Sequence, residues 1–510
     1  MPQGALPFNY ESQRQGQGFT GLGGLPVYMD LAHRLNLAAS IDKHVGLKAQ
    51  SQGWTDSELV MSLIWLNLAG GDHVDDLKLL RADEGFCRLL VQSRHYGMKR
   101  RERRALVNRW RKERKQDVGS HAVPSPSAVF RYLSMFCVPG ETTGVKGTAH
   151  IPSTGRGLRG LAQVNRDMLS AGHANKSGSV ATLDMDATIV ATHKAAALYC
   201  YKGYQSYQPF NVWWAETGMI VHTEFRDGNV PAGFDQLRIL KESLAALPAG
   251  VDTVQVRSDT AGYQHDLLKY CDSGHNERFG RIRFAVGCDV TPEFKRAVSE
   301  VDEKDWQPLK RFRNGQWEET HRQWAEVCFV PNAIGHSKNG PAYRYVATRE
   351  PLREQLPLDG LGQAPQYSFP TMTINDRRYK VFGTVTNTDM PGDELLRWQY
   401  GRCGKSEEAN RAIKHDFAGG KLPTSRFYEN AAWWWIAVLA YNLNAIMKDL
   451  VMGGQWVKRK MKAIRFGLIR LPGQVVQRAR TLRIRLSRAN PVLEWIRELR
   501  ARISALSVPV

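Results

Sequence analysis

Apolar and polar residues alternate along residues 181–190, and this alternation predicts a strand with two unlike faces. The apolar face is formed by Leu183, Met185, Ala187 and Ile189. The polar face carries Asp184 and Asp186 between two threonines. Aspartate is depleted in strands because its short side chain competes for backbone hydrogen bonds, so two on one face need a cause, and a divalent metal is the usual one. The alternative is a strand end with a solvated acidic edge.

Apolar residues recur at helical spacing on both sides of this strand. Residues 24–92 have the pattern of several helices, and Thr55 with Glu58 three residues later has the spacing of a capping box. The most apolar segment, residues 433–447, is too short to span a bilayer and contains two asparagines. It therefore predicts a buried helix, and we expect no membrane segment.

The segments that follow the acidic strand predict a mixed sheet. Strand-like runs at 211–216 and 219–225 precede a helical run at 234–246 and another strand, 251–259, which ends at Asp259. Three strands, a helix and a further strand are the order of an RNase-H-like core, in which carboxylates from separate strands meet at one point. We therefore expect Asp259 to lie near the aspartates of the first strand.

These patterns predict a multidomain chain of the α+β or α/β class. Pro, Gly and Asn separate further strand-like runs after residue 280, which we interpret as an insertion into the core. The expected regions are a helical DNA-binding region at 1–150, the first part of the RNase-H-like core at 180–280, a β-rich insertion at 281–390, the C-terminal helices of the core at 391–450 and a basic C-terminal region at 451–510.

The charge of the chain favours a polyanionic partner. Lysine and arginine number 70 against 50 acidic residues, which gives a net charge of +20, and nucleic acid is the simplest polyanion. Eleven Lys or Arg against two acids fall within residues 94–115, where apolar residues interrupt the charge and predict an ordered basic helix. The candidate DNA contacts in this helix are Arg100, Arg101, Arg104 and Lys112. The alternative is a cationic surface without a nucleic-acid partner.

The cysteines exclude two classes of protein. All seven are scattered, and no Cys-x-x-Cys pair occurs, which argues against both a disulfide framework and a structural zinc site. This cysteine usage fits a reducing cytosol. The first residues lack a basic region followed by an apolar one, so we expect no signal peptide.

A third carboxylate lies within residues 400–414. If a helix begins at Ser406, then Glu407, Arg411 and Lys414 share one of its faces. An acid and two cations would then point the same way. The alternative is an exposed helix with salt-bridged neighbours.

Residues 400–414 resemble the DDE transposases of bacterial insertion sequences, specifically insertion sequence family 1380 within the superfamily named after insertion sequence 4. That group carries a Tyr-x2-Arg-x3-Glu-x6-Lys signature, which Tyr400, Glu407 and Lys414 fill at the right spacing. The signature arginine is replaced by Cys403, with Arg402 beside it. The resemblance extends over about residues 180–480 and includes the runs Leu183-Asp-Met-Asp-Ala-Thr, Val256-Arg-Ser-Asp and Asn430-Ala-Ala-Trp-Trp-Trp.

This resemblance implies a cut-and-paste DNA transposase whose acids hold divalent metal. It gives Asp186 the role of bridging two Mg²⁺ ions, for which Mn²⁺ substitutes, while Asp259 and Glu407 complete the set. Such ions take carboxylate oxygens, and a pair of them can activate the attacking oxygen of a phosphodiester displacement and stabilise the leaving one. Asp184 shares the strand face with Asp186 and stays open as a ligand. Expected DNA contacts near these acids are Tyr400, Arg402, Arg411 and Lys414.

The implied partners are double-stranded DNA, at terminal inverted repeats and at a target, and a second copy that forms a dimer on the DNA. The implied location is the bacterial cytoplasm, at the nucleoid. Two other functions fit the same residues. One is a transposase-derived DNA-binding regulator in which the acids are unused, and the other is an RNase-H-like nuclease without strand transfer.

The missing signature arginine directs attention to Arg402. Counting back four residues from Glu407 puts Cys403 on the same helix face, and Arg402 would then point away. Gly404 weakens a helix by about 1 kcal/mol relative to alanine, so the turn before Ser406 can instead be a loop. Because a planar, permanently charged guanidinium suits a phosphate better than a thiol does, we expect Arg402 to swing in and serve in its place.

Overall fold

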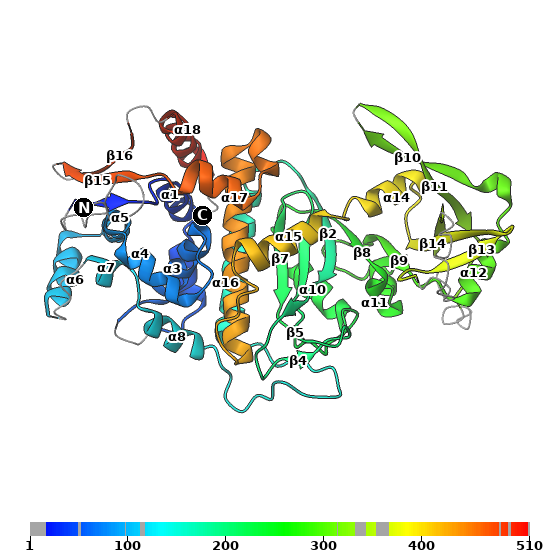
Figure 1. Cartoon of the computed structure of the whole chain (residues 1–510), viewed down its shortest axis with the longest axis horizontal. Coiled ribbons are helices and arrows are strands. Elements are labelled where there is room, and N and C mark those ends of the chain that lie inside the picture. The colour runs from blue at the N-terminus through cyan, green and yellow to red at the C-terminus, as the bar shows by residue number, and fades with distance from the viewer. Residues whose placement is uncertain are drawn as a thin grey trace, which may run out of the picture.

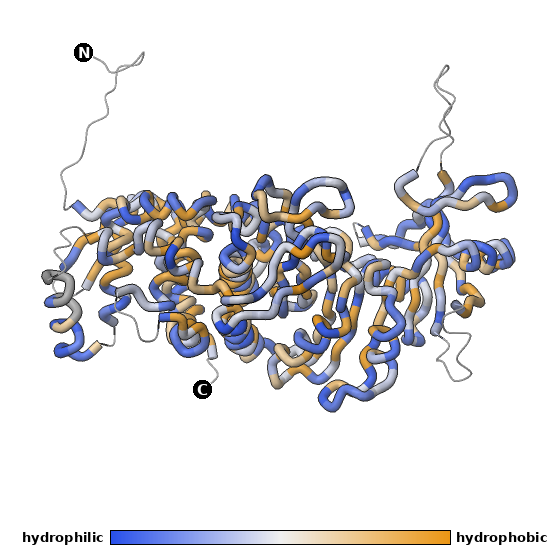
Figure 2. Tube along the Cα trace, turned by 90° about the horizontal axis from the view of Figure 1, so that it is seen from below, coloured by the Kyte–Doolittle hydropathy of each residue, from blue (hydrophilic) through white to orange (hydrophobic). Residues whose placement is uncertain are grey.

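The computed structural model describes residues 17–48, 53–96, 98–112, 118–313, 315–331, 343–352, 367–478, 481–487 and 491–507. The molecule is elongated, with helices at one end, strands at the other and one long helix between them (Figure 1). Figure 2 shows the hydrophobic segments gathered inside the molecule, with hydrophilic segments along its outline.

The N-terminal region forms the helical end (Figure 1). Its helices are α1 Pro26–Arg34, α2 Leu37–His44, α3 Asp56–Ala69, α4 Leu77–Ala82, α5 Glu84–Arg94, α6 Arg100–Lys112, α7 Val118–Ala122 and α8 Pro126–Ser134. The Thr55 hydroxyl accepts the backbone N–H of Glu58, and the Glu58 carboxylate accepts the backbone N–H of Thr55. This confirms the predicted capping box at the start of α3.

The strands beside the long helix form a mixed sheet. Its central strands are β2 Val180–Ala187, β6 Phe210–Trp214, β7 Met219–Glu224, β8 Thr253–Ser258 and β9 Arg283–Cys288. β2 pairs antiparallel with β6 and parallel with β8, and β6 pairs antiparallel with β7. β8 pairs parallel with β9, so the spatial order is β7-β6-β2-β8-β9. Between β7 and β8 lies α10 Gln236–Ala246, and between β8 and β9 lies α11 His265–Asp272.

The sheet does not divide at residue 280, where the sequence led us to place the start of an insertion. β9 lies inside the range 281–390, yet it pairs with β8 along its length, and β14 pairs with β9 in turn. The remaining strands are β10 Gln307–Arg313, β11 Gln316–Val327, β12 Arg344–Pro351, β13 Thr371–Ile374 and β14 Arg377–Thr386. Four of them extend the same sheet in the order β10-β11-β12-β14-β9, and β13 pairs with β14 off this path, so the extra strands are hydrogen-bonded to the central ones.

The long helix α16, Phe427–Ile446, separates the helical end from the sheet (Figure 1). It packs against α3, α8, α9 (Arg156–His173) and β7. Its three consecutive tryptophans, Trp433, Trp434 and Trp435, are all buried. The predicted buried helix is therefore confirmed, and in the described part of the chain no helix is long and apolar enough to cross a membrane.

The C-terminal region returns to the N-terminal helices. β15, Gly473–Arg478, pairs with β1, Phe19–Thr20, and with β16, Thr481–Arg485. The last helix, α18 Val492–Ala505, packs against α1. Elements from two stretches that the sequence suggested as separate regions, α1 to α8 from 1–150 and β15, β16 and α18 from 451–510, thus lie together at one end of the molecule (Figure 1).

Candidate active site

Asp186 and Asp259 lie side by side because β2 and β8 are parallel neighbours: Asp186 is near the C-terminal end of β2, and Asp259 directly follows β8. Met185 of β2 pairs with Ser258 of β8, so the next residue of each strand is an aspartate. The Asp259 carboxylate accepts the backbone N–H of Ala261, which fixes the turn after β8. The predicted convergence of the first two acidic strands is therefore present in the fold.

Glu407 reaches this edge from a helix. α14, Gly392–Tyr400, ends before a turn, and α15, Lys405–Arg411, carries Glu407 in its first turn. The pKa of Asp186 is raised to about 7, first by burial and then by the negative charges of Asp259 and Glu407, while the charge of Arg402 and a hydrogen bond from Asn410 oppose the shift. Asp186 therefore lies close enough to Asp259 and Glu407 for their charges to act on it, as expected where acids are gathered at one site.

Asp184 forms a buried ion pair with Arg257 and does not face the other acids' shared site as a free carboxylate. Its two oxygens accept Nε and Nη2 of Arg257 at 2.6 and 2.9 Å, and its side chain is fully buried. Arg257 also donates to the backbone oxygen of Trp398 at 2.6 Å and lies against the Trp398 ring. Burial raises the pKa of Asp184, and the hydrogen bonds and charge of Arg257 oppose that shift. We therefore remove Asp184 from the candidate ligands: strand parity left it open, but its oxygens already neutralise a buried guanidinium.

Arg402 faces the acids from the turn between α14 and α15. Gly404 has φ +77°, so the residues before Lys405 are not part of α15, as expected from that glycine. Nη2 of Arg402 lies 3.9 Å from Oδ2 of Asp259, and the side chain is 12 % exposed. Its Nε is buried and has no hydrogen-bond partner within the described residues. Cys403, in contrast, is exposed.

The other expected DNA contacts near the acids differ in their surroundings. Nζ of Lys414 donates to the backbone oxygen of Ile189 at 3.3 Å; burial lowers its pKa and the charge of Asp186 opposes that shift. The hydroxyl of Tyr400 instead lies 3.3 Å from that of Thr348 on β12. Lys414 thus borders the acids, whereas Tyr400 is tied to the strand-rich end.

Arg411 is held by two acids of its own segment. Its guanidinium donates to Glu408 at 2.7 and 2.8 Å and to Asp416 at 2.8 Å. Asp416 closes the π-helical turn Ala412–Asp416 that follows α15. This is the salt-bridged arrangement that we gave as the alternative for this helix, and it leaves Arg411 a bracing role in the structure.

The basic helix predicted from the charge run is α6, at the outer end of the helical part (Figure 1). Arg100, Arg101 and Arg104 are exposed on it. Lys112 belongs to α6, but its side chain lies outside the described residues. This helix is therefore well separated in the fold from the three acids, which lie at the sheet.

Two functional candidates escaped the sequence reasoning. Asn410 donates from Nδ2 to Oδ2 of Asp186 at 3.0 Å, and Arg257 neutralises Asp184 as described above. Asn410 lies three residues after Glu407 on α15, so helical spacing could have placed it on the same face. No local pattern could have paired Arg257 with Asp184, because the two lie on different strands.

The donor chemistry of the site fits a hard divalent cation. Asp186, Asp259 and Glu407 offer carboxylate oxygens, which such ions prefer. Within the described ranges, no group of three or more His, Cys, Asp or Glu side chains is close enough to hold an ion as it stands. The acids are thus gathered at one edge without forming a closed cage.

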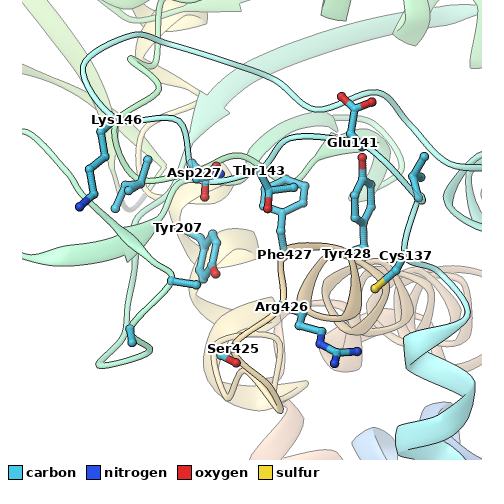
Figure 3. Close-up of a pocket in the computed structure, with 15 residues that line it drawn as sticks. Cys137, Glu141, Thr143, Lys146, Tyr207, Asp227, Ser425, Arg426, Phe427 and Tyr428 are labelled. Carbon is cyan, nitrogen blue, oxygen red and sulfur yellow. Dashed lines mark hydrogen bonds between the residues drawn. The ribbon is translucent and has the colours of Figure 1, made fainter.

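A pocket with a mixed polar and apolar lining, separate from these acids, lies between the segment after α8 and the start of α16 (Figure 3). Its volume is about 540 Å³, and Asp186, Asp259 and Glu407 do not line it. Burial raises the pKa of Asp227 in its wall to about 6, opposed by a hydrogen bond from the backbone N–H of Gly144. Its other charged groups include Glu141, which accepts from Ser153, and Arg426, which pairs with Glu429.

The comparison with protein families decides the class of the chain. The family described as "Transposase DDE domain group 1" matches residues 9–508. The chain belongs to this family of DDE transposases. It is accordingly a DDE-type transposase enzyme, and the family uses divalent metal ions.

The remaining comparisons add less to this family assignment. The transposase is similar to a chain in a structure titled "Cryo-EM structure of piggyBac transposase synaptic complex with hairpin DNA (SNHP)", with 9% identity and a TM-score of 0.40. The match covers 86% of this transposase and 78% of that chain. No functionally curated protein matches the sequence.

Proposed function

We propose that this transposase cuts DNA at the terminal inverted repeats of its own element and joins the freed 3′ ends to target DNA, by a cut-and-paste route. The observation that carries the proposal is the meeting of Asp186, Asp259 and Glu407 at one sheet edge. The strand order β7-β6-β2-β8-β9 supports an RNase-H-like core, in which such a set performs phosphodiester displacement.

Two Mg²⁺ ions, or Mn²⁺ in their place, are the cofactors that we propose. Asp186, Asp259 and Glu407 would hold them, and the bound metal would activate the attacking oxygen and stabilise the leaving oxygen. Arg402 and Lys414 border the acids and would neutralise the phosphate of the cut strand. The buried ion pair between Arg257 of β8 and Asp184 of β2 would hold together the two strands that carry Asp186 and lead to Asp259.

Metal-dependent cleavage and joining are the reactions that test this function. The full chain is incubated with repeat-bearing DNA, a target plasmid and either Mg²⁺ or a chelator. We expect nicks at the repeat ends and joined products in the reactions that contain Mg²⁺, and neither in the reactions that contain the chelator. Cleavage without joining would identify a nuclease that lacks strand transfer, and specific binding without any cleavage would identify a DNA-binding regulator.

The cellular setting follows the same proposal. We infer that the chain belongs to insertion sequence family 1380, acts on double-stranded DNA as a dimer and works in the bacterial cytoplasm at the nucleoid. The Tyr400, Glu407 and Lys414 spacing supports the family, and the net charge of +20 supports a nucleic-acid partner. Inverted repeats flanking the gene and a two-to-one ratio of protein to paired repeat ends would both be expected.

Metal binding should strengthen as the pH rises through about 7. Asp186 has its pKa raised from 3.8 to about 7, so below this value it carries a proton that must leave before an ion can bind. Each pH unit below 7 should weaken Mn²⁺ binding about tenfold, measured by titration calorimetry. The metal-free protein should also lose stability as the pH rises from about 3.8, the pKa of Asp186 in the unfolded chain, to about 7, its pKa in the fold. Over this range the folded state binds more protons than the unfolded state does. A flat Mn²⁺ affinity between about pH 6 and 8 would contradict the assignment of Asp186.

Arg402→Ala should lower cleavage at least about tenfold, or about 1.4 kcal/mol of transition-state stabilisation. The reason is that the Arg402 guanidinium is partly exposed and faces Asp259, while its buried Nε has no hydrogen-bond partner within the described residues, so the group is available to a phosphate. Cys403→Ala should cleave normally because this thiol is exposed, and Cys403→Arg should partly rescue Arg402→Ala. Normal cleavage by Arg402→Ala together with failure of Cys403→Ala would assign the role to the thiol position.

We propose that α6 contributes to binding of the repeat ends. Replacing Arg100, Arg101 and Arg104 by alanine should weaken that binding and reduce the slope of log affinity against log salt by about 0.9 for each lost phosphate contact. The control replaces three exposed cations elsewhere, Lys241, Arg283 and Arg296. Equal salt slopes for both triple variants would remove α6 from the DNA interface.

A further inference from the structure

A continuous chain of hydrogen bonds runs from the long helix α16 to Asp186. Nε1 of Trp434 donates to Oγ1 of Thr223 at 2.8 Å, and that hydroxyl donates to Oδ1 of Asn211 at 2.5 Å. Nδ2 of Asn211 donates to Oδ1 of Asn410 at 2.7 Å, and Nδ2 of Asn410 donates to Oδ2 of Asp186 at 3.0 Å. The chain therefore links α16, β7, β6, α15 and β2 through side chains alone.

The direction of these bonds is fixed from both ends. The indole N–H of Trp434 can only donate, and at the other end Oδ2 of Asp186 accepts the Asn410 amide, which is the only role open to it once the carboxyl group is ionised. Each intervening side chain therefore accepts a hydrogen bond from the residue on the Trp434 side and donates one to the residue on the Asp186 side. This sets the amide orientations of Asn211 and Asn410. Exposure of Trp434, Thr223, Asn211 and Asn410 is 0%, 1%, 1% and 5%, so water cannot replace a missing partner.

Asn410 joins two parts of the site that no backbone bond connects. It lies on α15 three residues after Glu407, while Asp186 lies on β2, directly across from Asn211 of β6. A single amide thus ties the helix of the third acid to the strand of the first. The bond occupies one oxygen of Asp186 and orients its carboxyl plane, which is how partners behind a metal ligand set its direction.

We propose that Asn410 is a positioning residue that fixes Asp186 and the helix of Glu407 for metal binding, and that Asn211, Thr223 and Trp434 hold its amide in the donating orientation. This inference rests on the proposed function, because it assumes that Asp186 holds metal. It adds that the packing of α16 helps to set the geometry of Asp186 on β2, although β7 and β6 lie between α16 and β2.

A second buried asparagine network supplies a matched control. Asn165 of α9 donates to the backbone oxygens of Ile220 and Val221 at 3.0 Å, and Asn442 of α16 donates to Asn165 at 2.7 Å. Asn165 and Asn442 are 1% and 0% exposed, as buried as the residues of the chain that ends at Asp186. This second network does not lead to an acid, so its loss should lower stability alone.

The test measures Mn²⁺ binding by calorimetry and thermal unfolding on the full chain. We expect Asn410→Ala to weaken Mn²⁺ binding about 10–100-fold, the range seen when a partner behind a metal ligand is removed. Thr223→Val, which removes only the linking hydroxyl, should weaken binding in the same direction by a smaller factor. Thr223→Ser should restore it, and Asn165→Ala should unfold at lower temperature with unchanged Mn²⁺ affinity.

The outcomes separate this inference from the function beneath it. Wild-type Mn²⁺ affinity in both Asn410→Ala and Thr223→Val overturns the positioning role, while the proposed function stands if Asp186→Asn still removes binding. Equal losses of affinity in Asn165→Ala and Thr223→Val also overturn it, because the effect would then be one of general stability. Mn²⁺ binding that Asp186→Asn leaves unchanged overturns both.

Discussion

Asp186→Asn is expected to lower DNA cleavage by well over about a hundredfold while leaving binding to repeat-bearing DNA intact. The magnitude follows because even partners behind a metal ligand cost about 10–100-fold when removed, and Asp186 is proposed as the ligand itself. Asp184, two residues earlier on the same face of the strand, is the matched position at which the same substitution should leave cleavage in place. Cleavage of a labelled repeat end and gel-shift binding would be measured side by side.

The control is Asp184→Asn, which changes the same chemical group two residues away. It should lower stability, because Arg257 would keep a buried charge without a full counterion, and its folded fraction should still cleave. Asp259→Asn and Glu407→Gln should behave like Asp186→Asn. Full cleavage by Asp186→Asn with an inactive, normally folded Asp184→Asn would return the ligand role to Asp184.

Arg257→Met should destabilise the protein by about 3–5 kcal/mol, the cost of breaking a buried ion pair from one side. The Asp184 carboxylate would be left without its guanidinium in a fully buried position, and the bond to the Trp398 backbone would also be lost. The change would be measured from the midpoint of urea unfolding. Loss of the guanidinium also removes what opposes the raised pKa of Asp184, so the destabilisation should be smaller at acid pH, where the carboxyl takes up a proton.

The double variant Arg257→Met with Asp184→Leu distinguishes a charge effect from a packing effect. Replacing both members of a buried pair by apolar residues is often neutral or stabilising. Most of the lost stability should therefore return in the double variant. A double variant as unstable as Arg257→Met would mean that the shape of the arginine, and not the isolated carboxylate, accounts for the loss.

The sequence predicted the elements that depend on local pattern. The alternation along residues 181–190 gave the strand β2, Thr55 and Glu58 gave the start of α3, and Gly404 gave the break before α15. In each case neighbouring residues determine the backbone conformation directly, through side-chain parity, a cap or a left-handed turn.

What the sequence could not supply depends on contacts between distant residues. Parity treats Asp184 and Asp186 alike, and they differ only because Arg257, on the neighbouring strand, reaches the first of them. The continuity of the sheet past residue 280 depends on pairs such as Val286 with Val385, which no local window contains. The partner of Asp186 on α15 was likewise visible only once β2 and α15 were placed together.

The position of α16 limits how the chain can be divided or recombined. This helix packs against α3 and α9 and also against β7, so its apolar surface is shared between helices that precede the first acidic strand and the sheet. A fragment that begins at the first acidic strand would leave the part of α16 that packs against α3, α8 and α9 facing water. Exchange of N-terminal regions between related transposases would therefore have to carry a matching α16 surface.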